Sequence, residues 1–176
     1  NIAGGIVFSL FPFYVNHKFG VASAGLGTMF FISNIAMAFS KGTASSFAKR
    51  LGGIKSITVG IALSSLFLLL MPISPSFGVL AVFYVFRMST RFMSDPLITS
   101  MFMRSVSEEE KSTANSIRMI SMNGGGVLSP VLGGILMEKI SLDTPVFIGG
   151  VLTLIVAFLY PLLLKQEADV LMENGI

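Results

Sequence analysis

Three ionisable residues, Arg87, Arg91 and Asp95, fall inside the apolar stretch VFYVFRMSTRFMSDPLITS. Their i, i+4, i+8 spacing places them on one face of a helix as a single polar stripe. An arginine near the centre of a bilayer costs roughly 2.5–3.5 kcal/mol on insertion scales, so its charge has to be offset. Asp95 can neutralise Arg91, which leaves Arg87 to face a cavity, an anionic ligand or a carboxylate elsewhere. The stripe predicts a pathway for a substrate or a proton, and a purely structural network between helices is the alternative.

Polar side chains also interrupt two other apolar stretches. Asn34 falls in the middle of one, and Asn123 shares a helical face with Asn115 in the other. We interpret Asn34 and Asn123 as further candidates for the substrate or ion pathway. Arg118 lies closer to an expected helix end, where its long side chain can reach the lipid headgroups or pair with Asp95.

The segment GGGVLSPVLGG brings glycines and a proline to the middle of an apolar helix. Small residues let helices approach closely, and Pro130 removes one backbone hydrogen bond. The segment therefore predicts a helix bend or a close-packing element. Its residues are Ser129, Pro130, Gly133 and Gly134.

The composition excludes an ordinary soluble domain. Of 176 residues, 53% are apolar and 12% are charged, whereas soluble domains carry about 25% charged residues. The chain has no cysteine and one histidine, so we expect no metal site and no cofactor. Enzyme motifs are missing, and we predict that the protein is not an enzyme. The net charge of +3 comes from basic residues between the apolar stretches, so we expect no nucleic-acid partner.

Long apolar stretches separated by short polar connections predict an all-α, polytopic membrane helix bundle with six transmembrane helices, because backbone in lipid must satisfy its own hydrogen bonds. The six expected spans are residues 1–15, 23–40, 56–71, 77–103, 112–137 and 144–164. They form one transmembrane domain at residues 1–165, surrounded by the lipid bilayer. Residues 166–176 are expected to be a polar cytoplasmic tail that frays.

Lysine and arginine are distributed unevenly between the two sets of connections. One set, together with the tail, holds seven: Lys41, Lys49, Arg50, Lys55, Arg104, Lys111 and Lys165. The other set holds only Lys18 and Lys139. Because lysine and arginine concentrate in cytoplasmic loops, both ends of the chain are predicted to be cytoplasmic. The membrane that we expect the protein to span is the plasma membrane.

The first expected span is short. Its residues rise only about 23 Å, against a hydrocarbon core of about 30 Å. It has no initiator methionine and lacks the basic region of a signal peptide. We therefore expect the chain to be a fragment, cut inside a helix of a longer protein.

Three motifs resemble the major facilitator superfamily. The stretch SFAKRLGGIK resembles its cytoplasmic motif G-x-x-x-D-R-x-G-R-R: Arg50 and Gly52 match, Lys55 supplies a nearby basic residue, and Lys49 replaces the aspartate. The resemblance implies a gating loop formed by these four residues.

The other two motifs lie in the fourth and fifth expected spans. Arg87, followed by Pro96, is similar to the arginine-bearing fourth helix of the family's first half, although Arg91 stands where the family usually has glycine. The run Ser-Pro-Val-Leu-Gly-Gly at residues 129–134 resembles the G-P-x-x-G-G bend of the family's fifth helix.

The resemblance implies that this chain is the C-terminal six-helix half, helices seven to twelve, of a transporter whose N-terminal six-helix half is missing here. It further implies two halves that rock around a central site. The function so implied is secondary active transport of small solutes by alternating access, coupled to protons, with drug or metabolite efflux as the candidate activity. The alternative is a non-transporting six-helix membrane protein with an assembly or regulatory role.

Overall fold

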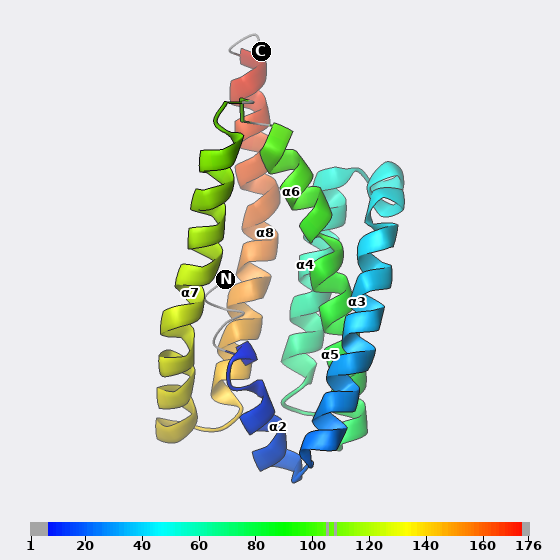
Figure 1. Cartoon of the computed structure of the whole chain (residues 1–176), viewed down its shortest axis with the longest axis vertical. Helices are drawn as coiled ribbons and strands as arrows, with labels where there is room; N and C mark the ends of the chain where they lie inside the picture. The colour runs from blue at the N-terminus through cyan, green and yellow to red at the C-terminus, as the bar shows by residue number, and fades with distance from the viewer. Residues whose placement is uncertain (1–6, 105, 108, 174–176) are drawn as a thin grey trace.

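The computed structural model describes residues 7–104, 106–107 and 109–173, and their side chains except at 104, 121–128 and 163–173. The described residues form seven helices (Figure 1), and no strand is assigned among them. The helices are α2 (Phe11–Phe19), α3 (Ser23–Leu51), α4 (Gly53–Leu70), α5 (Phe77–Met93), α6 (Asp95–Arg104), α7 (Lys111–Lys139) and α8 (Thr144–Glu173). The all-α prediction is confirmed.

The connections between helices gather at two ends of the bundle. The α3–α4 and α6–α7 connections and the end of α8 lie at one end, which we call the basic end (Figure 1). The α2–α3, α4–α5 and α7–α8 connections lie at the opposite end. The helices therefore run back and forth in the order that the alternating basic and non-basic connections predict.

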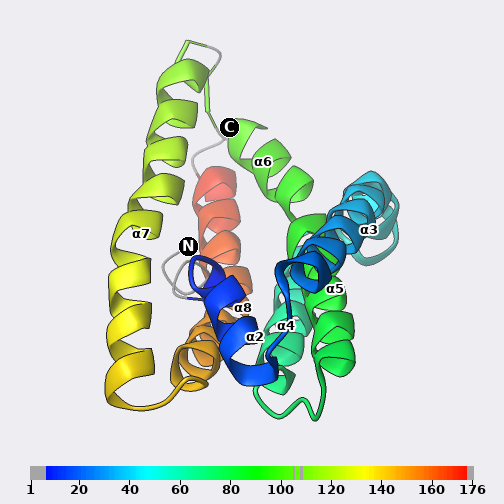
Figure 2. The ribbon, with the colours of Figure 1, turned by 60° about the horizontal axis from the view of Figure 1, so that its bottom comes forward.

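Helix α4 packs between α8 and α5, and α3 packs along α5. Helix α7 packs mainly against α8 and lies away from α3 (Figures 1 and 2). Among the described residues, α3, α4 and residues 144–162 of α8 are each long and apolar enough to cross a membrane. The bundle thus consists of a tightly packed group, α3, α4, α5 and α8, with α7 at its side.

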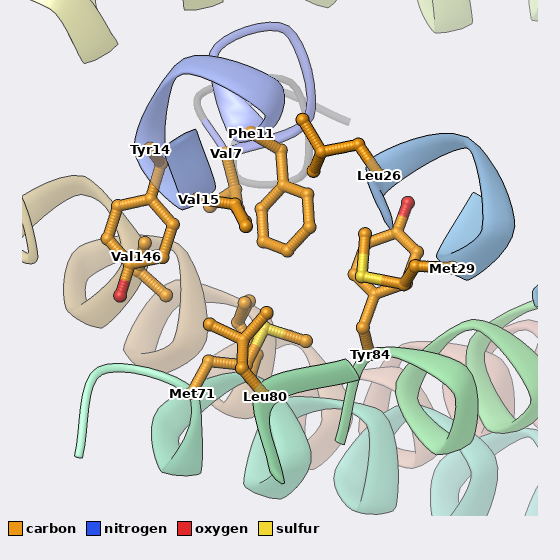
Figure 3. Packing of buried hydrophobic residues seen from close by; sticks show 11 residues of the cluster. Val7, Phe11, Tyr14, Val15, Leu26, Met29, Met71, Leu80, Tyr84 and Val146 are labelled. Carbon is orange, nitrogen blue, oxygen red and sulfur yellow. The ribbon is translucent and has the colours of Figure 1, made fainter. Parts of the chain in front are cut away.

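The largest cluster of buried apolar side chains lies where α2 folds over the opposite end (Figure 3). Phe11 and Tyr14 of α2 are fully covered and meet Leu80 and Tyr84 of α5 and Val146 of α8. The rings of Phe11 and Tyr84 stack with their centroids 4.5 Å apart. Burial of this face holds the short α2 on the bundle, since a helix of nine residues is marginal on its own.

The fourth expected span, residues 77–103, is divided into α5 and α6 at Ser94. The cause is Pro96, which has no backbone N–H to donate to the Phe92 carbonyl oxygen four residues earlier and whose ring crowds that carbonyl. Gly60 of α4 packs against this break, because a Cβ at Gly60 would lie 2.5 Å from Ser94 Oγ and 3.0 Å from the Thr90 carbonyl oxygen. Because Gly60 has no side chain, α4 can pack closely against the helix break at Ser94.

Three other boundaries differ from expectation. Helix α2 continues past residue 15 to Phe19 and ends at Gly20, whose φ of 64° suits glycine. Helix α3 continues past residue 40 to Leu51, so its connection to α4 is Gly52 alone, with φ of 85°. The backbone of α8 stays helical to Glu173, past the expected end of the sixth span at residue 164.

Four groups meet at the opposite end in what we call the Lys18–Asp143 cluster. The ammonium of Lys18 donates to Asp143 Oδ1 and to the Pro72 carbonyl oxygen, each at 2.5 Å. The Tyr14 hydroxyl donates to the same Asp143 oxygen at 2.6 Å. The cluster joins α2 to the α4–α5 and α7–α8 connections, and the Lys18 side chain is only 18% exposed.

We expect Asp143→Asn to lower the free energy of unfolding by about 1–2 kcal/mol, because the partly buried ammonium loses its counter-charge. The thermal unfolding midpoint of the purified protein in detergent measures the change. Glu109→Gln, which removes an exposed charge from the α6–α7 connection, is the control and should leave the midpoint unchanged. Equal midpoints for Asp143→Asn and the unmodified protein would show that the cluster contributes nothing to stability.

We expect Gly60→Ala to destabilise the bundle by about 1–3 kcal/mol, because the new methyl group has to push the helix break away. The matched control is Gly27→Ala on α3, where an added Cβ meets nothing within 4 Å. Unfolding of both variants in the same detergent gives the comparison. If Gly60→Ala were as stable as Gly27→Ala, the close contact at Ser94 would not constrain the fold.

Candidate functional site

The polar stripe of the sequence lies along α5 and the start of α6. Arg87 follows Leu80 and Tyr84 on the buried face of α5, at helical spacing, and only 3% of its surface is exposed. Arg91 and Asp95 lie on either side of the helix break at Ser94 and are partly exposed. The structure therefore separates the stripe into a buried cation and a more accessible pair.

Arg87 has no carboxylate partner among the described side chains. Its guanidinium carbon lies 4.4 Å from the centroid of the Phe8 ring, a cation–π contact. Its Nη1 contacts the Met88 sulfur at 3.8 Å, and its Nε is buried without a hydrogen-bond partner. A buried charge with so few polar contacts is costly unless an anion offsets it.

An aromatic layer lies next to this guanidinium. The Tyr84 ring is one helical turn from Arg87, and its centroid lies 6.5 Å from that of Phe8 and 5.7 Å from that of Phe30. Phe11, which is 1% exposed, stacks on the Tyr84 ring and lies tilted against the Phe30 ring. These rings exclude water from one side of the guanidinium, so an anion that reaches it would be held strongly.

Arg91 and Asp95 form the ion pair that their spacing predicts. Arg91 Nη1 lies 3.2 Å from Asp95 Oδ1, and the two side chains are 30% and 26% exposed. The pair links α5 to α6 across the break. Because Asp95 is already paired with Arg91, the polar stripe itself offers no counter-charge to Arg87.

The alternative in which Arg118 pairs with Asp95 is not what the structure shows. Arg118 Nη2 instead donates to Thr99 Oγ1 at 2.9 Å, one turn farther along α6. The Thr99 hydroxyl in turn donates to the Asp95 carbonyl oxygen at 2.8 Å. Arg118 thus ties α7 to α6 near the basic end and does not change the charge at Asp95.

The two asparagines predicted for the pathway do not join Arg87 in the described structure. Asn34 is exposed on α3 and donates to the Phe30 carbonyl oxygen of its own helix at 2.8 Å. The side chain of Asn123 lies outside the described side chains.

The residues of the expected gating loop lie together at the basic end. Lys49 and Arg50 are exposed in the last turn of α3, and Lys55 is exposed in the first turn of α4. Gly52 stands between the two helices. The connection is therefore a single glycine flanked by basic helix ends, which is shorter than the loop predicted from the sequence.

The segment predicted to bend α7 lies inside a continuous helix. Helix α7 runs from Lys111 to Lys139 with Pro130 in its interior. Ser129 and Gly133 are buried, as a close-packing segment requires, and a Cβ at Gly134 would make an ordinary contact with Leu10 at 3.9 Å. Among the described backbone of the fourth and fifth expected spans, the interruption falls at Ser94 instead.

Sequence reasoning missed the Lys18–Asp143 cluster and the break at Ser94. The cluster joins residues 125 positions apart, which no local pattern connects. The break had a local signal, because Pro96 follows Asp95 in the middle of an apolar stretch.

The arrangement can bind an anion or exchange counter-ions. Arginine stays protonated in proteins, so Arg87 presents a permanent positive charge and cannot itself carry a proton on and off. Beside it, Arg91 and Asp95 compensate each other. A membrane protein that keeps an uncompensated cation inside a helix bundle is suited to moving charged or polar solutes.

Comparison with known proteins agrees with this geometry. The family model of the Major Facilitator Superfamily matches residues 2–174. No curated protein and no solved structure matches the chain. The match spans all of the described helices, and the fold has the apolar, alternating helices that a membrane transporter requires. The chain belongs to the Major Facilitator Superfamily of membrane transporters.

Proposed function

We propose that this chain is the C-terminal six-helix half of a secondary transporter that moves small solutes by alternating access. In this proposal the transport is coupled to protons, and the activity is efflux of drugs or metabolites across the plasma membrane. An N-terminal six-helix half completes the central site. Substrate binds between the halves, as in transporters built from two repeated bundles.

The observation that carries the proposal is the burial of Arg87 without a carboxylate among the described side chains. Its counter-charge then comes from the solute or from an acid of the N-terminal half. An exchange between these two partners would couple solute binding to the rocking of the halves, because a buried cation always favours the state in which it is paired. The transported proton travels on Asp95, on the substrate or on the N-terminal half, of which we favour the last.

The remaining predicted residues take supporting roles in this proposal. Arg91 and Asp95 line the pathway as a neutral pair, and Asn34 and Asn123 supply polar contacts along it. Lys49, Arg50, Gly52 and Lys55 gate its cytoplasmic end. Ser129, Pro130, Gly133 and Gly134 let α7 pack closely while the halves move. The exposure of the basic residues at one end and the burial of Ser129 and Gly133 support these roles.

We expect Arg87→Ala in the complete protein to reduce transport at least about tenfold, because a charge-assisted contact is worth about 1.5–3 kcal/mol. Arg87→Lys keeps the charge but loses the planar guanidinium, and should retain part of the activity. Substrate-dependent proton flux in proteoliposomes gives the rates, normalised to the amount of protein inserted.

Phe86→Ala is the matched control, because Phe86 precedes Arg87 on α5 and is 52% exposed. It should transport normally. Normal transport by Arg87→Ala would contradict the proposed role and would favour the alternative in which the stripe is a purely structural network between helices. If Arg87→Ala fails to insert, the Arg87→Lys rate decides the question.

The proposed orientation is open to a labelling test, because the chain contains no cysteine. With Lys49→Cys or Lys111→Cys, we expect a membrane-impermeant maleimide to react only in inside-out vesicles. With Lys139→Cys, we expect reaction in intact cells, since this residue lies at the other end of α7. Reaction of Lys49→Cys and Lys139→Cys from the same side would contradict the proposed topology.

A further inference from the structure

Helices α3 and α5 pack along each other and run in the same direction, from the opposite end of the bundle to the basic end (Figure 1). Two contacts mark the line along which they meet. Phe30 of α3 lies against Tyr84 of α5, with ring centroids 5.7 Å apart. Nearer the basic end, the Lys41 ammonium lies 5.3 Å from the centroid of the Phe92 ring. Because Arg87 comes between Tyr84 and Phe92 on α5, this line leads from the buried cation toward the basic end.

Positive charge prevails along this line. Neither α3 nor α5 contains an aspartate or a glutamate. Arg91 lies one turn from Arg87, and its guanidinium carbon is 5.8 Å from the centroid of the Phe92 ring. Lys41 contacts the same ring. Asp95, the first residue of α6, compensates Arg91. One carboxylate therefore faces three cations, and the remaining positive charge favours a negatively charged solute.

Lys41 is the accessible cation of this group. It is exposed and has no ion-pair partner among the described side chains. The helical rise places it about 27 Å from the start of α3 at Ser23, near the far boundary of a hydrocarbon core of about 30 Å. Its ammonium thus lies where a solute from the basic end would enter the bundle.

An aromatic ring lies beside each cation of this line. The half-buried Phe92 ring accompanies Lys41 and Arg91. The Phe8 ring accompanies Arg87 in the same way. A small hydrated anion would lose water beside these rings without gaining an apolar contact, whereas an anion with an aromatic body gains both the charge and the contact.

We propose that Lys41, Arg91 and Phe92 form an entry site for organic anions with an aromatic body, and that the anionic group passes from this entry site to Arg87. The inference rests on the proposed transport function and names the class of solute, which supplies the negative charge that Arg87 lacks. Both Lys41 and Arg87 repel a cationic solute, and a neutral solute gains nothing from either charge.

Equilibrium binding of radiolabelled naphthalene-2-sulfonate to the purified complete protein in a nonionic detergent tests the inference. We expect saturable binding that Lys41→Gln weakens about fivefold, because an ion pair at an exposed side chain is worth less than a buried one. Lys41→Arg keeps the charge and should bind within about twofold of the unmodified protein. Phe92→Leu should weaken binding about threefold by removing the ring while keeping an apolar side chain.

Lys139→Gln is the matched control, because it removes the same charge from an exposed position at the opposite end of the bundle. It should bind as the unmodified protein does. Naphthalene-2-sulfonamide, which has the same body and no charge, should not displace the bound sulfonate.

The inference is overturned if the unmodified protein shows no saturable binding, if Lys41→Gln binds as tightly as the unmodified protein, or if the neutral sulfonamide competes equally well. It is also overturned if the protein retains phosphatidylglycerol through Lys41 but does not bind the sulfonate. That result would assign Lys41 to the lipid headgroups.

Binding in detergent does not require transport, so this test and the test of the proposed function fail separately. Binding that depends on Lys41, together with normal proton flux in Arg87→Ala, would leave the entry site standing and overturn the proposed role of Arg87. Loss of flux in Arg87→Ala, together with binding that does not depend on Lys41, would overturn only the entry site.

Discussion

Polar groups inside this bundle have to find their partners within the chain, because lipid offers none. Several hydroxyl and amide side chains meet this demand locally: Ser33, Asn34 and Thr153 each donate to the carbonyl oxygen four residues earlier in their own helix. The charged side chains cannot be satisfied in this way and need a second charge. The arrangement of helices therefore follows from how the buried and partly buried charges are paired, and among the described side chains the buried charge of Arg87 has no carboxylate partner.

The charges divide by location into three situations. At the opposite end, the Lys18–Asp143 cluster pairs its charges between α2 and two connections. At the helix break, Arg91 and Asp95 compensate each other at partial exposure. Between these two places the guanidinium of Arg87 is buried against Phe8 and next to Tyr84. This contrast is the physical reason to assign the solute-linked role to Arg87, since the other two sites have no unmet charge to offer.

Helix α7 differs from the rest of the bundle in how it is held. It packs mainly on α8, while polar contacts tie its surroundings to other helices at both ends: Arg118 bonds to Thr99 of α6, and Asp143, just beyond α7, bonds to Lys18 of α2. Between these two ties, α7 contributes Gly134 and Glu138 to a pocket that it shares with α2. A helix fixed at its ends and lightly packed along its length leaves room for a ligand beside it.

The amino-acid sequence by itself determined the class of the protein, the order of the helices, the separation of basic from non-basic connections, and the single face shared by Arg87, Arg91 and Asp95. These features depend on composition and on residues a few positions apart, which the geometry of a helix converts directly into faces and lengths. Only the tertiary structure decided that Arg87 lies under Phe8, that Arg118 bonds to Thr99 instead of Asp95, and that Lys18 meets Asp143. Each of these contacts depends on which helices pack together and on the register between them. A local pattern predicts that one face of a helix is polar, but the residues that this face contacts come from a distant part of the chain.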